Sequence, residues 1–405
     1  MLAALFKVAF DAVRANKLRS GLTLLGVMIG VTSVMTIMSA LEGMAASIEQ
    51  DLGRLGPYTF MVERMGIITS EEMFLEKIKR KPLDMDAHDL IQEGCENCEK
   101  VGARVYTFSK VKYHSQSMRD IFIAGMTANM VDIVDFEVAR GRFVSFEDDL
   151  YSRQVAIIGD LVREQFFEGV EPLGKEIKIG PIKYTVIGVF EKQGTSFGQS
   201  RDNFVVIPMN AHIHQFGKPE RRLTIFVKAF GMESLPNAMD ETRMILRAQR
   251  HVPYNKDDDF DLLTADNILE TINQFTQFAR FALVGISSIS LVVGGIVVMN
   301  IMMVSVTERT REIGIRKSIG AKQSHIRWQF LFESLILTLS GGLIGIVLGY
   351  IAATYLIGLM GMQMTPSMLA IFSGLSISVG TGLIFGLYPA IKAARLDPIK
   401  ALSYE

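Results

Sequence analysis

Charged side chains are missing from three long stretches of this sequence, and their absence excludes an ordinary soluble protein. No Asp, Glu, Lys or Arg occurs in residues 21–41, 281–307 or 334–391. Core helices of soluble proteins rarely run so far without a charge, whereas about 20 apolar helical residues cross a bilayer core of roughly 30 Å. The third stretch is long enough for two helices, and Gly, Pro and polar residues at 361–367 predict the turn between them.

We therefore predict an integral membrane protein with four transmembrane α-helices and a large α/β domain between the first and second. The predicted spans are residues 21–41, 276–306, 334–360 and 368–391, with a short outer loop at 361–367. The domain covers residues 42–275.

Lys and Arg gather beside the spans on one side only. Residues 1–20, 307–333 and 392–405 are rich in them, whereas the loop at 361–367 has none. Because positive residues stay in the cytoplasm, both termini and the 307–333 loop are expected inside the cell. The protein is then a multi-pass inner-membrane protein whose block 42–275 is periplasmic.

Residues 1–20 alternate apolar and charged positions at helical spacing, which predicts an amphipathic helix on the cytoplasmic surface, in contact with lipid. A plain cytoplasmic extension is the alternative. A cleaved signal peptide fits poorly, because the apolar run at 21–41 exceeds the usual length of about 7–15 residues.

The outer block has the pattern of a mixed α/β domain. Alternating or continuous short apolar runs predict strands at 154–158, 176–179, 184–190, 204–207 and 223–229. Helices are expected at 160–167, with Asp160 as its cap, and at 234–251. A third helix at 264–281 is expected to run straight into the second span.

Catalytic motifs are scarce. Residues 169–175 (GVEPLGK) resemble a phosphate-binding loop, but Glu176 replaces the Ser or Thr that would hold magnesium, and a strand follows. His212 and His214 have no apparent third ligand and are expected at the surface. No basic stripe suggests nucleic acid. We therefore expect no enzymatic activity, no metal and no cofactor in this chain.

The sequence has only two cysteines, Cys95 and Cys98, both in the outer block. An oxidising compartment favours a short local disulfide between them. A redox-active pair and two free thiols are the alternatives.

The loop between the second and third spans carries the most informative pattern. Glu312 and Arg316 form an i,i+4 pair, so the second span is expected to continue as a helix until Gly320 breaks it. A second helix is expected to start near Lys322. A charged helical elbow of this kind is suited to receive the motion of a soluble partner protein. The alternative is a loop whose only role is to fix the membrane topology. The candidate coupling residues are Glu308, Arg309, Arg311, Glu312, Gly314, Arg316, Lys317, Gly320, Ala321, Lys322 and His325.

Small residues recur one helical turn apart in three spans and let helix backbones approach closely. Gly26 and Gly30 in the first span are the predicted contact between two subunits, with packing inside the chain as the alternative. The series Gly341, Gly345 and Gly349 in the third span is expected to pack within the chain.

The membrane-flanking segments at 15–26, 307–326 and 386–402 resemble those of the permeases of the MacB/FtsX superfamily of ABC transporters, also called type VII. Gly141-Arg142-Phe143 and the segments 155–159, 172–175 and 186–189 resemble the periplasmic domain of that family.

The resemblance implies a chain that pairs with a second copy of itself or a paralogous permease. In MacB the ATPase domain is fused to the permease, so the resemblance implies that a separate ABC ATPase binds ATP and magnesium here. It also implies a two-part periplasmic domain with an insertion at about 113–203.

Three functions then compete. An efflux or export permease, in a tripartite system with a periplasmic adaptor and an outer-membrane channel, is the first. A mechanical relay for lipoprotein release or for control of a cell-wall hydrolase is the second, and an anchored sensor without an ATPase is the third. The uncharged spans offer no polar conduit and are better suited to act as levers.

Overall fold

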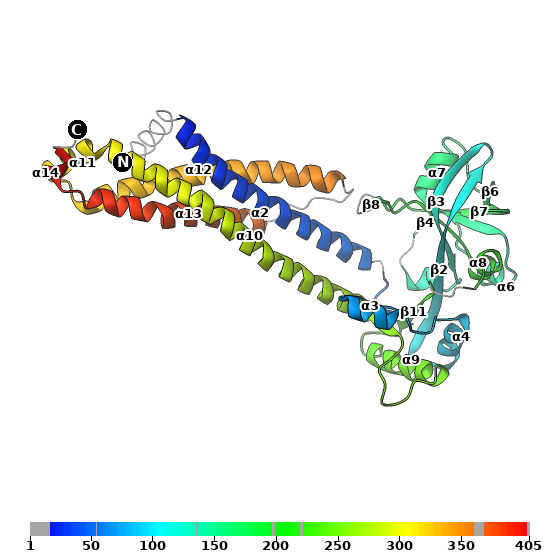
Figure 1. Cartoon of the computed structure of the whole chain (residues 1–405). Helices are drawn as coiled ribbons and strands as arrows, with labels where there is room; N and C mark the ends of the chain where they lie inside the picture. The colour runs from blue at the N-terminus through cyan, green and yellow to red at the C-terminus, as the bar shows by residue number, and fades with distance from the viewer. Residues whose placement is uncertain are drawn as a thin grey trace. The chain divides into compact units, whose positions relative to one another are not determined.

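The computed structural model of the chain describes residues 17–53, 55–134, 137–196, 199–218, 222–359 and 368–402. Two compact units make up the chain (Figure 1). One is formed by Met1–Ala46 with Gln274–Glu405, and the other by Ser47–Asn273.

Parts of three expected segments lie outside the described residues. The helix expected over 1–20 is described only at 17–20, which begin the first long helix, α2. The expected outer loop at 361–367 is not described, and the tail is described only as far as residue 402.

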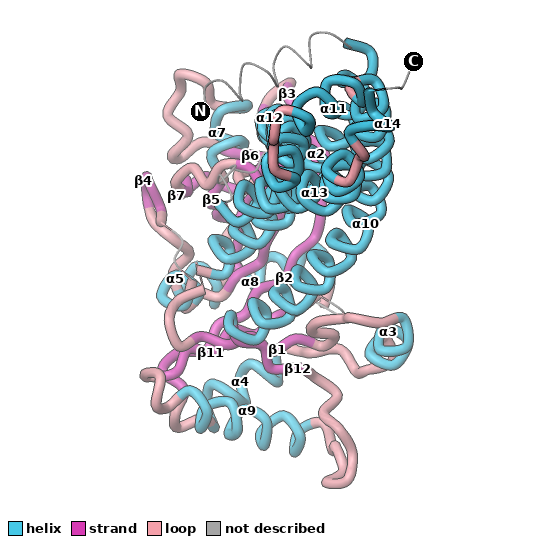
Figure 2. Tube along the Cα trace, turned by 90° about the vertical axis from the view of Figure 1, so that its left-hand side faces the viewer, coloured by secondary structure: helices cyan, strands magenta, loops and turns pink. Residues whose placement is uncertain are grey.

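Four long helices dominate the first unit, and each contains a stretch apolar enough to cross a membrane. They are α2 (Lys17–Leu52), α10 (Ala265–Glu308), α12 (Gln323–Leu359) and α13 (Met368–Ala394). Figures 1 and 2 show them running alongside one another. The predicted fold class is confirmed: four apolar helices, with a large α/β domain between the first and the second. As expected, α10 begins well before the apolar stretch and continues into it without a break.

Glycines bring the helix backbones of this unit close together. The Cβ position of Gly345 on α12 lies 2.9 Å from the Met28 carbonyl oxygen and 3.0 Å from Val31 Cβ, both on α2. Thr32 Oγ1 donates a hydrogen bond of 3.1 Å to the Gly345 carbonyl. The glycine series of the third span therefore packs within the chain, as predicted.

Gly26 also has a neighbour within the chain. Its Cβ position lies 3.3 Å from the Cα of Gly294 on α10, and Gly30 is buried in the unit. The structure thus gives Gly26 an intrachain packing role, and a subunit contact through Gly26 and Gly30 stays a prediction.

The second unit is built on one sheet of ten strands in the order β12-β1-β11-β2-β3-β10-β5-β7-β4, with β6 beside β2 and β7. A short hairpin, β8 (Thr195–Ser196) with β9 (Gln199–Ser200), stands apart from it. The sheet strands are β1 (Thr59–Glu63), β2 (Cys98–Tyr113), β3 (Gln116–Met126), β4 (Val138–Gly141), β5 (Val155–Ile158), β6 (Glu176–Ile179), β7 (Ile182–Phe190), β10 (Phe204–Pro208), β11 (Thr224–Ala229) and β12 (Asp261–Thr264).

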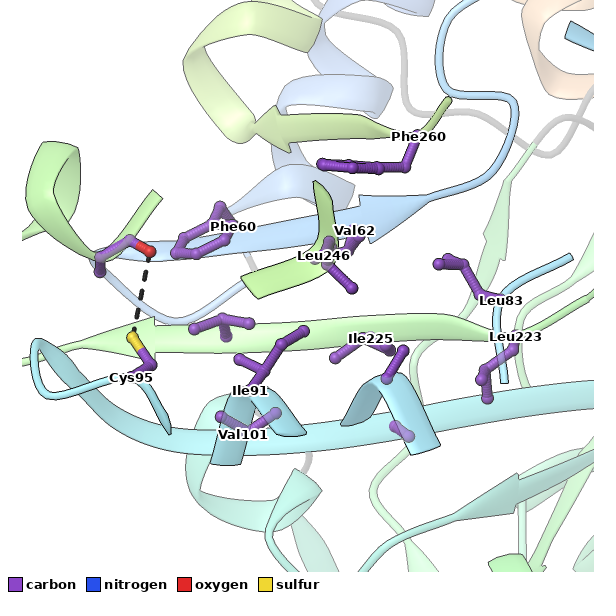
Figure 3. Close-up of a cluster of buried hydrophobic side chains, with 14 of the residues drawn as sticks. Phe60, Val62, Leu83, Ile91, Cys95, Val101, Leu223, Ile225, Leu246 and Phe260 are labelled. Carbon is purple, nitrogen blue, oxygen red and sulfur yellow. Dashed lines mark hydrogen bonds between the residues drawn. The ribbon is translucent and has the colours of Figure 1, made fainter. Parts of the chain in front are cut away.

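Seven helices belong to this unit among its described residues: α3 (Glu71–Lys77), α4 (Met85–Gly94), α5 (Met130–Ile133), α6 (Phe146–Leu150), α7 (Asp160–Phe166), α8 (Met209–Phe216) and α9 (Leu235–Gln249). One hydrophobic core lies where α4 and α9 pack on β1, β11 and the start of β2 (Figure 3). A second core is built from β3, β5, β6, β7, β10 and α7. The second core overlaps the insertion expected at 113–203. Because β2 supplies side chains to both cores, the two cores lie on one continuous sheet.

Two local expectations are wrong. Gly159, not Asp160, is the N-cap of α7, and Asp160 is the first helical residue, where its carboxylate pairs with Arg163. His212 is not at the surface: it lies on α8 rather than on a strand, is 3% exposed and packs against Gly125. Burial lowers its pKa to about 4, so the ring is neutral at neutral pH.

A disulfide joins Cys95, which follows α4, to Cys98, which opens β2. Cys95 is buried in the first core beside Phe60 and Ile91 (Figure 3). Its Sγ also lies 4.0 Å from the Ala238 carbonyl oxygen, the dashed line of Figure 3. Because an oxidised sulfur has no proton to donate, this approach is a packing contact. The disulfide therefore links the C-terminal end of α4 to β2, one of the strands on which α4 packs.

The double substitution Cys95→Ala/Cys98→Ala is expected to lower the local opening free energy of β2 by about 2 kcal/mol, because so short a loop restricts the unfolded chain only modestly. Hydrogen exchange of the β2 amides measures this loss. A reductant should reproduce the effect in the wild type and have none in the variant. Unchanged exchange in both cases would show that the bond does not stabilise this region.

Candidate coupling site

The loop between the second and third spans folds into a separate short helix, α11 (Thr310–Ser318). The expected continuation of the second span past the membrane is therefore wrong: α10 ends at Glu308, and Arg309 leaves the helical conformation with φ −103° and ψ 15°. The Arg309 guanidinium turns instead to Glu333 on α12, with Nη1 3.3 Å and 3.2 Å from its two carboxylate oxygens. This ion pair fixes the corner between α10 and α11.

Gly320 ends the elbow, as the sequence predicted. Its φ of +96° is the left-handed conformation that glycine adopts at low cost. The Gly320 amide donates to the Lys317 carbonyl, and the Ala321 amide donates to the Arg316 carbonyl, which is the Schellman pattern of a helix C-terminus. Lys322 follows, and α12 begins at Gln323 with His325 in its exposed first turn.

The inner face of α11 packs against the C-terminal helix α14 (Pro398–Leu402). The Cβ position of Gly314 lies 2.8 Å from Ala401 Cβ, so a larger side chain at 314 would push α14 away. Lys317 Nζ donates hydrogen bonds of 2.9 Å and 2.5 Å to the carbonyl oxygens of Ala394 and Leu396 at the end of α13. The lysine charge there also opposes the negative end of the helix dipole.

The outer face of α11 is a mixed charged and apolar surface. Arg311, Glu312 and Arg316 are exposed, and Glu312 lies 3.9 Å from Arg316 as the i,i+4 pattern predicted. Two isoleucines are exposed beside these charges: Ile315 is 47% exposed, and Ile319, which follows the last residue of α11, is 81% exposed. We call Arg311, Glu312, Ile315, Arg316 and Ile319 the elbow face.

The predicted coupling residues thus divide by position. Glu308 and Arg309 form the corner, Gly314 and Lys317 hold α11 from within, and the charged members of the elbow face point outward. Sequence reasoning missed the two exposed isoleucines and the α14 residue Ala401. The isoleucines could have been found from the sequence, because they are apolar residues in a charged loop. The contact with Ala401 could not, because no sequence pattern marks it.

The groups that this site presents to solvent are arginines, a carboxylate and two isoleucines. Among the described residues, no group of three or more His, Cys, Asp and Glu side chains could hold a metal ion. The elbow face offers arginines for charge pairing and isoleucines for apolar burial, the combination found at the centre of many protein interfaces.

Comparisons with known proteins match two family models to successive parts of the chain. Residues 20–245 match the MacB-like periplasmic core domain family, and residues 284–398 match the FtsX-like permease C-terminal family. The macrolide export ATP-binding/permease protein MacB of Bdellovibrio bacteriovorus is 31% identical over 98% of this chain and 61% of its own length. The uncharacterized ABC transporter permease YknZ of Bacillus subtilis is 32% identical over 98% of both chains.

The chain therefore spans about three fifths of the MacB relative and nearly all of the YknZ relative. Among solved structures, the periplasmic region of MacB from Actinobacillus actinomycetemcomitans covers 56% of this chain and 97% of its own, with 16% identity and a TM-score of 0.46. The extracellular domain of YknZ from Gram-positive bacteria covers 51% and 100%, with 18% identity and a TM-score of 0.41.

Proposed function

This chain belongs to the MacB/FtsX-like family of ABC transporter permeases, and we propose that it transmits the motion of a separate ATPase subunit to its extracytoplasmic domain to drive export. Both termini and α11 then lie in the cytoplasm, and the ten-stranded domain lies in the periplasm. ATP and magnesium bind to the ATPase partner. The YknZ relative, named as a permease and matched over 98% of its length, supports this division of labour.

The observation that carries the proposal is the braced elbow. Helix α11 is held by Arg309 on one side and by Gly314 and Lys317 on the other, while Ile315 and Ile319 remain exposed. A helix that transmits motion from a partner protein must be accessible to that partner and held firmly by the rest of the chain. A loosely held helix would move alone, and the motion would not reach the spans.

Continuous helices support transmission without a substrate path through the spans. Helix α2 extends past Ala46 to Leu52, and α10 starts at Ala265, before Gln274, so a single helix enters the periplasmic unit at each connection. The uncharged stretches at 21–41, 281–307 and 334–391 contain none of the ionisable side chains that line a polar conduit.

Assembly is a further part of the proposal. We expect two permease chains, identical or paralogous, above two ATPase subunits, with an adaptor and an outer-membrane channel completing an efflux system. A mechanical relay for lipoprotein release or for control of a cell-wall hydrolase is the second candidate, favoured by the uncharged spans. Co-purification of an adaptor and channel, or of a hydrolase or lipoprotein carrier, separates the two.

The substitution Ile319→Asp tests the docking role of the elbow face. Burying a carboxylate in an apolar contact is expected to weaken ATPase binding about tenfold or more. Ile319 is 81% exposed and lies outside the hydrophobic cores, so the permease should fold normally. The measurements are pull-down of the ATPase and ATP hydrolysis by the complex.

Ile78→Asp on α3 is the matched control, because Ile78 is also exposed (42%) but belongs to the other unit. It should bind the ATPase like the wild type. If Ile319→Asp assembles and hydrolyses ATP at the wild-type rate, α11 is not the docking helix.

A further inference from the structure

The α/β unit (Ser47–Asn273) contains a cavity of about 700 Å³, lined by residues of α4, α6 and α8 and of the segments beside them. Sites for small ligands usually measure about 300–1,000 Å³. Apolar side chains line much of it, among them Leu83, Met85, Phe146 and Ile213. Phe146 is 71% exposed, so part of this apolar wall is open to a ligand.

Acidic side chains outnumber basic ones in the lining. Four carboxylates face two lysines, Lys81 and Lys218. The four are Asp84, Asp86, Asp89 and Asp149. Asp84 already accepts the Ala87 amide as the N-cap of α4, so its oxygens are partly occupied.

His88 lines the cavity with an unsatisfied ring nitrogen. The residue is 5% exposed, and its Nδ1 lies 2.8 Å from Asp89 Oδ1. Nε2 is buried and has no hydrogen-bond partner among the described residues. Because Nε2 itself has almost no accessible surface, His88 forms part of the cavity wall rather than a hydrogen-bonding group for a ligand.

Asp149 supplies a carboxylate that is fixed and poorly hydrated. Its Oδ1 accepts the Asn210 amide at 2.8 Å, and its carbonyl accepts from Asn210 Nδ2 at 3.0 Å. A capping box between Ser145 and Asp148 starts α6, the helix that contains Asp149. Burial raises the pKa of Asp149, so its charged form lacks the solvation that a cation could replace.

We propose that this cavity binds a small organic cation with an apolar body. Its N–H groups lie toward the Asp149 carboxylate, and its body lies against Phe146 and Ile213. Binding itself does not require the ATPase. The assignment of such cations as the exported class rests on the proposed transport function.

A fluorescence titration of the purified full-length chain with ethidium, a planar aromatic cation with N–H donors, tests the site without the ATPase. The wild type should bind ethidium saturably. Asp149→Asn keeps an acceptor for the Asn210 amide but removes the charge, and is expected to weaken binding about tenfold. Asp86→Asn, at the exposed rim, should weaken it about threefold.

Asp240→Asn is the control, because Asp240 is exposed on α9 and does not line the cavity. It should bind like the wild type, and the anion 8-anilinonaphthalene-1-sulfonate should not displace ethidium. The proposal is overturned if ethidium does not saturate, if both Asp149→Asn and Asp86→Asn bind with wild-type affinity, or if Asp240→Asn weakens binding as much as they do. A failure here leaves ATPase docking intact, whereas a wrong docking assignment appears only in Ile319→Asp.

Discussion

Replacing Gly382 by leucine is expected to disrupt the membrane unit, with a loss of about 3 kcal/mol or more in the free energy of unfolding. Gly382 lies on α13 where this helix packs against α12. A Cβ there would lie 3.2 Å from Leu335 Cα and 3.4 Å from the Ser334 carbonyl oxygen. Both are backbone atoms, so the helices would have to separate, and the 3.0 Å bond from Ser334 Oγ to the Gly382 carbonyl would break.

Gly380→Leu, two residues away on the same helix, is the matched control. Apart from its own helix backbone, no heavy atom of the described residues lies within 4 Å of the Cβ position of Gly380, and leucine has the higher helix propensity. Thermal unfolding of the detergent-purified chains should therefore show a lower midpoint for Gly382→Leu alone. Equal midpoints would mean that α12 and α13 do not pack through this glycine.

The glycine pattern illustrates what the sequence could predict about the membrane unit. Apolar runs identify helices because the bilayer demands them, and glycines one turn apart mark close approach. The pattern does not say which helix approaches. Gly345 contacts α2, Gly382 contacts α12 and Gly26 contacts Gly294, and these partners depend on packing between segments distant in the sequence.

The periplasmic unit was predictable where local pattern decides structure. Strands such as β6 and β10 follow from alternation or from short apolar runs. His212 was misjudged because the burial of a side chain depends on which face of an element it occupies, and the sequence pattern assigned no element to this segment, which is helix α8. The cavity could not be foreseen, since its walls come from α4, α6 and α8, which are far apart in the chain.

The coupling site shows the same limit. The charge pair of Glu312 and Arg316 and the break at Gly320 are local features, and both are present. The corner at Arg309 is not local, because Glu333 lies 24 residues further along the chain. The helix ends at Glu308, earlier than the i,i+4 pattern suggested, and the ion pair with the distant Glu333 lies at that corner.

That ion pair carries the second large expected effect: Arg309→Met should cost about 3–5 kcal/mol of stability, because it leaves the Glu333 carboxylate buried without a partner. The Glu333 side chain is 9% exposed, whereas that of Arg309 is 28% exposed and can turn toward water. Glu333→Leu should therefore cost less than Arg309→Met. The midpoint of thermal unfolding in detergent measures both losses.

The double variant Arg309→Met/Glu333→Leu distinguishes two causes of lost stability: the loss of the ion pair itself, and the burial of an unpaired Glu333 carboxylate. An apolar pair of similar volume should restore the stability to within about 1 kcal/mol of the wild type, since no buried charge remains. A double variant no more stable than Arg309→Met would instead mean that the corner needs the directed bidentate contact. Wild-type stability of Arg309→Met itself would mean that Glu333 is hydrated, and that the ion pair does not fix the corner between α10 and α11.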